Sequence, residues 1–313
     1  MLFRSPVSMN MIRCHHGNIR AYGVERGNCN LENNTVLPEG IETLEHRECA
    51  LAFRKTGEGP AVLFIQGVAV HGDGWQPQMV ELSTNYTCLS FDNRGIGNSQ
   101  PLGVKKLTVQ QMAEDALALI DAQAWNKCHI VGHSLGGHIA TALALTAPER
   151  VRSLALFCTS ARGKDMPPIT LQFLWTSLRS QIGPKPNRRR AFLEMIMPIK
   201  MRESEDLDEW ANKMAKIFGH DLAEAPSVLH KQVSAYRSHD ATSRLRELGS
   251  IPTIVASGSE DPVGPPRLGQ ALAEGIPNSE FHLLDGASHG MTVTHAEEIN
   301  KLLADHFSKT STQ

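Results

Sequence analysis

One serine constrains most strongly what this chain can fold into. It is flanked by glycines and lies at the junction of an apolar run and a small-residue stretch. The segment Cys128–Gly137 reads Cys-His-Ile-Val-Gly-His-Ser-Leu-Gly-Gly. Its apolar first part favours a strand and its small residues favour a helix, so the chain must turn sharply at Ser134. We expect Ser134 to adopt a strained backbone conformation, and a side chain at Gly132 or Gly136 to collide with neighbouring backbone. The segment therefore predicts a nucleophile elbow that exposes Ser134 at the end of a strand.

Short β-rich runs alternate with helical patterns over most of the chain. The clearest helix is expected at 109–122, where Thr108 can cap the N-terminus. The predicted strands are 50–55, 61–65, 86–91, 130–131, 154–158, 253–256 and 281–284. Because parallel strands need crossover helices, this alternation predicts an α/β fold with a mostly parallel sheet flanked by helices.

The alternation is interrupted at residues 161–240, where the pattern indicates several helices and no strand. We expect these residues to form a helical cap, inserted before the penultimate strand. Residues 46–160 and 241–313 then form the α/β core. Residues 1–45 are polar and weakly periodic, so we expect a loosely ordered N-terminal extension.

Ser134 needs a base, because a serine hydroxyl is a poor nucleophile at neutral pH until an imidazole accepts its proton. His289 is the candidate, since its small-residue loop directly follows the last predicted strand. A carboxylate must orient that imidazole, and Asp261 lies at the carboxyl end of the preceding strand, where open α/β sheets place their chemistry. The adjacent Glu260 is the alternative acid.

Acyl chemistry also needs an oxyanion hole, usually two backbone N–H groups. One is expected from Leu135, at the N-terminus of the helix that follows the nucleophile, where unpaired amides favour negative charge. The other is expected from Val68, because the segment Phe64–Val68 ends the strand before the first long loop.

Together these motifs resemble the α/β-hydrolase superfamily, from about residue 50 to the C-terminus, and the chain order Ser134, Asp261, His289 is that of this fold. Members of the family typically carry His-Gly where this chain has Gln66-Gly67, and a tryptophan where it has Trp75. The glutamine departs from the family pattern. It leaves the amide of Val68 available but changes how the loop that carries Val68, here called the oxyanion loop, is held in place. Residues 92–99 resemble the family segment Asp-x-Arg-Gly-x-Gly-x-Ser, which we interpret as bracing the active-site loops.

Within the superfamily the chain is most similar to capped esterases, enol-lactonases and cofactor-free haloperoxidase-like proteins of the serine-nucleophile branch. Dehalogenases and most epoxide hydrolases of this fold use an aspartate at the elbow, so a serine argues against those activities. The resemblance implies a serine hydrolase that cleaves carboxylic esters. The apolar cap residues suggest a pocket for an apolar acyl or alcohol group; examples are Phe173, Trp175, Met195, Met197 and Met214.

Other reactions remain open, because the same triad supports carbon–carbon bond hydrolysis, acyl transfer and perhydrolysis. A ligand-sensing receptor of the same fold can also keep the triad.

The composition of the chain limits the kinds of binding partner to expect. Its formal net charge is −2 over 313 residues, which gives no indication of nucleic-acid binding. Without a signal peptide, a membrane span, or a nucleotide or metal motif, we expect a cytoplasmic enzyme with a small-molecule ester substrate and no cofactor.

Overall fold

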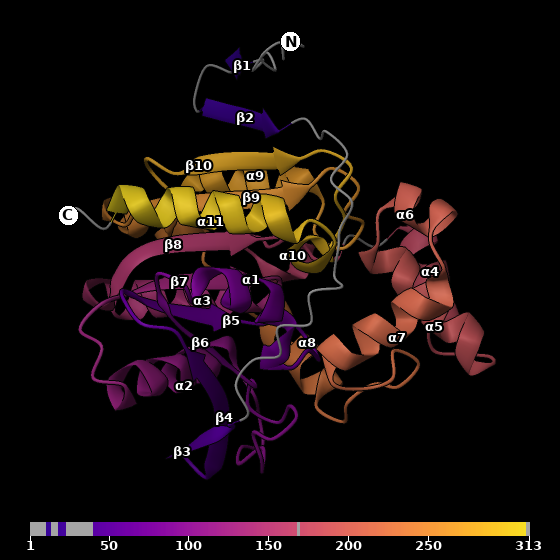
Figure 1. Ribbon diagram of the computed structural model, residues 1–313, viewed down its shortest axis with the longest axis horizontal. Coiled ribbons are helices and arrows are strands. Elements are labelled where there is room, and N and C mark those ends of the chain that lie inside the picture. Colours follow the sequence, from indigo (N-terminus) through magenta and orange to yellow (C-terminus); the bar gives the residue numbers. More distant parts are fainter. Residues whose placement is uncertain (1–10, 14–17, 23–39, 168–169, 311–313) are drawn as a thin grey trace, which may run out of the picture.

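Ten strands form one mostly parallel sheet in the computed structural model, which describes residues 11–13, 18–22, 40–167 and 170–310 (Figure 1). The sheet order is β1-β2-β10-β9-β8-β7-β5-β6-β4-β3. Pairing is antiparallel between β1 and β2 and among β6, β4 and β3, and parallel elsewhere. The strands are β1 (Met11–Arg13), β2 (Asn18–Tyr22), β3 (Glu42–His46), β4 (Cys49–Thr56), β5 (Ala61–Ile65), β6 (Thr87–Phe91), β7 (Cys128–His133), β8 (Val151–Phe157), β9 (Thr253–Gly258) and β10 (Glu280–Leu284).

The central strands are buried because helices cover both faces of the sheet. Every residue of β5, β7 and β9 is buried, as expected for parallel strands covered on both sides. One apolar cluster joins the sheet to α2 (Val109–Ala122), α3 (Leu135–Thr146) and α9 (Pro266–Gly275). A second cluster joins the other face to α1 (Gln76–Leu82), the short α10 (Met291–Thr294) and α11 (Ala296–Thr310).

The predicted fold class is confirmed. The helix with the clearest apolar periodicity was also predicted with accurate bounds. Helix α2 has the predicted bounds, and the Thr108 hydroxyl accepts a hydrogen bond from the amide of Gln111 at 3.0 Å. The strand expected at 130–131 is longer, because β7 also includes the polar residues His129 and His133. Both histidines are buried, so their polarity did not mark a strand end.

The sheet begins before residue 46, the start expected from the sequence. Strand β3 pairs with β4, and β2 pairs in parallel with β10. Strand β2 lies within residues 1–45, for which we expected a loosely ordered extension, and β3 crosses the end of that range. Strand β3 is an edge strand without a buried residue, so its sequence lacks the apolar alternation that marks a half-buried strand. Strand β1 also falls in this range, whereas residues 1–10, 14–17 and 23–39 of the expected extension lie outside the described residues.

Between β8 and β9, as predicted, the chain inserts a cap in which the described residues form five α-helices. They are α4 (Leu171–Arg179), α5 (Lys185–Ile196), α6 (Ile199–Ser204), α7 (Leu207–Phe218) and α8 (Leu229–Arg237). Figure 1 shows α4–α7 beyond the carboxyl end of β10. Two backbone hydrogen bonds join the segments that enter and leave the cap, from Ala241 to Ala161 and from Gly163 to His239, both at 3.0 Å.

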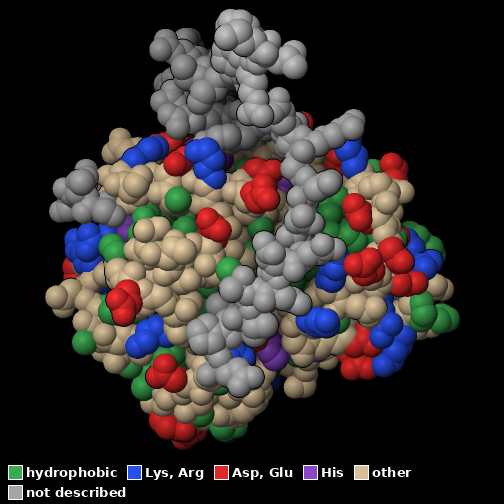
Figure 2. All heavy atoms as spheres, viewed as in Figure 1, with side chains coloured by type: hydrophobic (Ala, Val, Ile, Leu, Met, Phe, Trp, Pro, Cys, Tyr) green, Lys and Arg blue, Asp and Glu red, His purple; other side chains and the backbone are tan. Residues whose placement is uncertain are grey.

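In the described parts of the chain, four 3₁₀ segments connect these elements: η1 (Gly72–Trp75), η2 (Pro148–Arg150), η3 (Gly163–Asp165) and η4 (Thr242–Ser250). None of the helices among the described residues is long and apolar enough to cross a bilayer. On the face shown in Figure 2, Lys and Arg side chains are interspersed with Asp and Glu side chains.

Candidate active site

The backbone at Ser134 is strained, as the glycine pattern predicted. Its φ is 54° and its ψ is −118°, at the junction of β7 and α3. A Cβ at Gly132 would overlap the carbonyl oxygen of Gly136, and one at Gly136 would overlap the carbonyl oxygen of Ile65. Ser134 is the N-cap of α3, yet its side chain makes no capping hydrogen bond. The hydroxyl is therefore free to face another partner.

That partner is His289, in the loop after β10. The Nε2 atom of His289 lies 3.1 Å from the Ser134 Oγ, and its Nδ1 lies 2.8 Å from the Asp261 Oδ2. All three side chains are buried. The structure thus brings together the three side chains predicted from the sequence. The alternative acid, Glu260, instead accepts a hydrogen bond from the amide of Ile199 in the cap, at 2.7 Å.

Asp261 is held as a carboxylate by its hydrogen bonds. Its Oδ1 accepts from the amides of Val263 and Gly264, both at 2.8 Å, which leaves Oδ2 for His289. Burial alone would raise the pKa of Asp261, but the charge and hydrogen bond of His289 and the amide of Gly264 outweigh it, and the pKa lies below its usual value. A carboxylate accepts hydrogen bonds only, so when the ring of His289 is neutral its single proton lies on Nδ1 and the Nε2 lone pair faces Ser134.

The two predicted oxyanion donors border the same cavity as Ser134. Leu135 begins α3 and Val68 lies in the turn after β5, and both line this cavity. Gly67 approaches the nucleophile closely, since a Cβ there would lie 3.2 Å from the Ser134 Cβ. No described residue accepts a hydrogen bond from the amide of Val68 or Leu135. Both N–H groups are therefore available to a ligand.

Gln66, the departure from the family pattern, braces this loop. Its side-chain Oε1 accepts from the amide of Gly67 at 2.8 Å, and its carbonyl oxygen accepts from the Asn93 side chain at 2.9 Å. Gln66 is buried against Gly74, where a Cβ would overlap its side-chain nitrogen. The glutamine therefore fixes the start of the loop that carries Val68.

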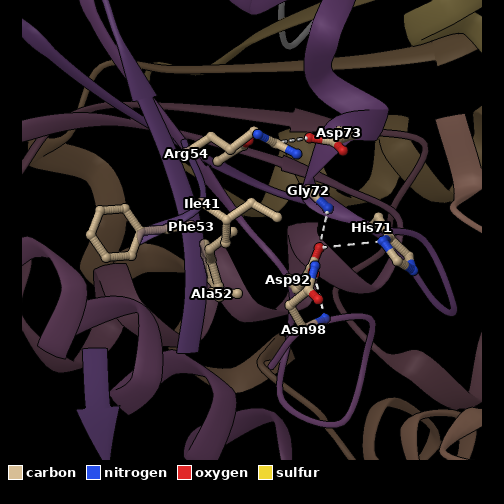
Figure 3. Close-up of a pocket in the computed structure, with 11 residues that line it drawn as sticks. Ile41, Ala52, Phe53, Arg54, His71, Gly72, Asp73, Asp92 and Asn98 are labelled. Atoms are coloured by element: carbon tan, nitrogen blue, oxygen red, sulfur yellow. Dashed lines mark hydrogen bonds and ion pairs between the residues drawn. The ribbon is translucent and has the colours of Figure 1, made fainter. Parts of the chain in front are cut away.

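Asp92, after β6, fixes the far end of the same loop. Figure 3 shows its carboxylate between Gly72 and Asn98 with His71 beside it. Oδ1 accepts from the amide of Gly72 at 2.8 Å and Oδ2 from the amide of Asn98 at 3.0 Å. Two residues on, the guanidinium of Arg94 is wholly buried and binds Asp115 through two hydrogen bonds. These contacts agree with the bracing role expected for residues 92–99.

One group of side chains among the described residues has nitrogen and sulfur atoms close enough to share a metal ion, namely His133, Cys158 and His289. Both ring nitrogens of His289 already contact Ser134 and Asp261. Burial, together with the charge of Asp261, raises the pKa of Cys158 well above its usual value, so the thiol keeps its proton. The two contacts of His289 fit a proton-transfer role for its ring.

His133, beside the nucleophile, is a neutral packing residue. Burial, together with the nearby charge of His289, lowers the pKa of His133 to about 3. Its Nε2 lies 2.8 Å from the carbonyl oxygen of His289. The ring of His133 therefore contacts the loop that carries the proposed base.

A cavity of about 480 Å³ lies between the core and the cap, and Ser134 and His289 line it. Its volume lies in the range of small-molecule sites, about 300–1,000 Å³. Of the apolar cap residues expected to form a pocket, Phe173, Met195 and Met214 line it. Trp175 instead lies on the outside of α4, with 61% of its surface exposed, and Met197 packs in the cap core.

A family model described as the alpha/beta hydrolase fold matches residues 60–296. The chain belongs to the α/β-hydrolase fold family. The matched range contains the elbow, the triad and the whole cap, so the resemblance stated from the motifs is confirmed.

Several members of this family are similar to the chain over most of its length. The "Putative carbamate hydrolase RutD" of Variovorax paradoxus is 31% identical over 264 residues, covering 81% of this chain and 94% of the relative. The "Putative non-heme bromoperoxidase BpoC" of Mycobacterium tuberculosis is 28% identical and covers 82% and 97%. The solved structure of Rv0554 from the same species has a TM-score of 0.72 at 25% identity, covering 84% of this chain and 94% of that one.

Two residues that contact the oxyanion loop have no signal in the sequence. Gln232 in α8 and His220 after α7 bind the backbone of Ala69, 163 and 151 positions away. Neither residue belongs to a recognisable motif, so only the folded chain could have identified them.

Proposed function

We propose that this α/β-hydrolase is a serine hydrolase that cleaves carboxylic esters through an acyl-enzyme. The observation that carries the proposal is the continuous hydrogen-bond chain from Asp261 through His289 to Ser134, at 2.8 and 3.1 Å, beneath the cavity. The strained backbone holds the Ser134 hydroxyl at the end of this chain without a competing capping bond. This is the arrangement that activates a serine toward a carbonyl carbon.

In the first half-reaction the Ser134 Oγ forms a bond to the substrate carbonyl carbon, and its proton passes to the His289 Nε2. The carbonyl oxygen becomes an oxyanion that the amides of Val68 and Leu135 stabilise, each contributing about 3 kcal/mol. His289 then donates the proton to the leaving alcohol as the C–O bond breaks. In the second half-reaction water attacks the acyl-enzyme, His289 accepts its proton and returns it to Ser134, and the carboxylic acid leaves.

The cavity favours esters with an apolar group of small to medium size. Among its lining residues, several large apolar side chains come from three cap helices: Phe173, Phe192, Met195, Ile196, Met214, Ile217 and Phe218. Burial of apolar surface supplies about 25 cal/mol per Å², so an apolar acyl or alcohol group gains affinity from these side chains.

Carbamate hydrolysis is the second candidate, because a relative 31% identical to this chain carries that name. The same attack on a carbonyl carbon would cleave a carbamate. A small polar carbamate would leave much of the apolar cavity unfilled, so we favour the ester.

The test is hydrolysis of p-nitrophenyl esters of increasing acyl length by the purified protein and by Ser134→Ala. We expect turnover by the wild type and a loss of about 10⁶-fold in the variant, because the alanine cannot form the acyl-enzyme. A carbamate panel and competing alcohol, thiol and peroxide acceptors, run in parallel, distinguish ester hydrolysis from carbamate hydrolysis, acyl transfer and perhydrolysis by their products. Undiminished turnover in Ser134→Ala would refute the proposed nucleophile.

A further inference from the structure

The amide of Val68 lies between two amides whose positions are fixed by side chains. The preceding amide, of Gly67, donates to the Gln66 Oε1 at 2.8 Å. The following amide, of Ala69, donates to the Gln232 Oε1, also at 2.8 Å. The direction of the Val68 N–H is therefore set by two glutamines, one from the core and one from the cap.

Ala69 needs such support because its backbone is strained. Its φ of 62° lies in the left-handed region, which costs a residue with a Cβ about 1–3 kcal/mol. A residue in this region persists only where its surroundings hold it. Without that support, Ala69 would relax to a negative φ and rotate the peptide groups on either side of it, Val68–Ala69 and Ala69–Val70. The Gly67–Val68 peptide, which carries the Val68 N–H, adjoins the first of these and would lose its fixed neighbour.

The cap supplies this support on both polar groups of Ala69. Gln232 is fully buried and accepts from the Ala69 amide, while the His220 Nε2 donates to the Ala69 carbonyl oxygen at 2.9 Å. Both residues come from the cap, and Val68 is in the core. The contact thus joins the two parts of the protein at the residue next to the proposed oxyanion donor.

The helix that carries Gln232 also forms a wall of the cavity. Leu229, Val233 and Tyr236 of α8 line the cavity that contains Ser134. A bound acyl or alcohol group that presses on these side chains acts on the same helix that holds Ala69.

We propose that Gln232 and His220 are positioning residues that set the oxyanion hole from the cap, so that contacts of the substrate with α8 affect the rate of acylation as well as binding. The proposal rests on the proposed function, since it concerns the amide of Val68 as an oxyanion donor. A residue with this role changes kcat more than KM, because the oxyanion exists only in the transition state.

The experiment compares Gln232→Met, which keeps the shape but removes the acceptor, with Gln232→Glu, which keeps an acceptor oxygen. Ser234→Ala is the matched control, an exposed residue on the same helix. We measure kcat and KM for a p-nitrophenyl ester, and the second-order rate at which an alkyl fluorophosphonate labels Ser134. Labelling forms a bond from the Ser134 Oγ to phosphorus and expels fluoride, and it needs the same oxyanion donors without needing a particular ester.

For Gln232→Met we expect kcat and the labelling rate to fall by about 10- to 100-fold, less than the 10²–10³-fold typical of a lost donor, with KM within about threefold. Gln232→Glu should recover most of that loss, and Ser234→Ala should match the wild type. If Gln232→Met does not fold, His220→Phe, which cannot donate to Ala69, carries the test with the same expected loss of labelling rate.

Two failures are distinguishable. If Ser134 of the wild type is not labelled and no ester is turned over, the proposed function fails. If the wild type is labelled and Gln232→Met, or His220→Phe in its place, is labelled at the same rate, the positioning role is overturned. A rise in KM with unchanged kcat would also overturn it, because it would reduce these residues to parts of the cavity wall.

Discussion

Replacing Asp261 with asparagine should reverse the hydrogen bonding of the proposed base. The Asp261 Oδ1 accepts from two backbone amides, of Val263 and Gly264, which can only donate. An asparagine must therefore direct its single oxygen toward these amides and its NH₂ group toward His289. That group can only donate, so the His289 Nδ1 must become the acceptor and the proton must move to Nε2. The Nε2 atom, 3.1 Å from the Ser134 Oγ, then has no lone pair to accept the hydroxyl proton.

The magnitude follows from this change of tautomer. A triad whose aspartate is changed to asparagine with intact geometry loses about 10⁴-fold in kcat, as known for a serine protease. At 1.36 kcal/mol for each factor of ten, this corresponds to about 5 kcal/mol of transition-state stabilisation. Because two amides fix the oxygen, the asparagine cannot flip without leaving both unpaired, so we expect nearly the full loss.

The assay is steady-state hydrolysis of a p-nitrophenyl ester at pH 7, with far-UV circular dichroism to check the fold. Glu260→Gln is the matched control, since its side chain keeps an oxygen for the amide of Ile199 and does not contact His289. We expect this control to retain wild-type kcat. A loss of less than 100-fold in Asp261→Asn, or an equal loss in Glu260→Gln, would contradict the assignment of Asp261 as the residue that orients His289.

Two further substitutions test the elbow and the buried histidines. Gly136→Ala should lower the unfolding free energy by about 3 kcal/mol, since the new Cβ overlaps the carbonyl oxygen of Ile65. Gly40→Ala is the control: nothing lies within 4 Å of its new Cβ, so its urea midpoint should equal that of the wild type. Equal midpoints for the two variants would contradict the predicted overlap at Gly136. Burial, together with the charge of a nearby histidine, lowers the pKa of His138 to about 3. Between this pKa and the usual value of 6.5, the unfolded chain binds a proton at His138 that the folded chain does not bind. Acidification in this range therefore destabilises the folded protein. His138→Phe should remove about 2 kcal/mol of the stability lost between pH 7 and pH 5, measured by urea unfolding at both values, and an unaltered pH dependence would contradict the buried neutral imidazole.

The three residues of the candidate triad could be selected from the sequence because each has a strong local signal. Ser134 lies between glycines that only a sharp turn requires, and Asp261 and His289 each follow a strand by a few residues. In a parallel sheet the carboxyl ends of strands share one edge. The topology therefore brings Ser134 and His289, 155 positions apart, to one edge of the sheet, where the loops place them 3.1 Å apart.

Other features could not be predicted, because they depend on long-range contacts or lack an apolar pattern. Strand β3 lies at the sheet edge without a buried residue, so its sequence does not alternate. On α4, Phe173 lines the cavity while Trp175 is 61% exposed, and the sequence gives no reason to orient two aromatic residues differently. The bond from Gln232 to Ala69 needs the whole cap to be folded and docked.

The supports of the oxyanion loop are divided between the two parts of the molecule. Its start is braced by Gln66 and its far end by Asp92, both in the core, whereas Ala69 between them is held by the cap. Any movement that carried α8 away from the core would break the bond to the buried Gln232 and leave the Ala69 amide unpaired, at a cost of about 1–3 kcal/mol. It would also release the strained φ of Ala69, next to the Val68 donor. A cap displaced in this way would leave Ser134, His289 and Asp261 in contact with only Leu135 fixed as a proposed oxyanion donor, so the proposed nucleophile and its base would be assembled while acylation was slow.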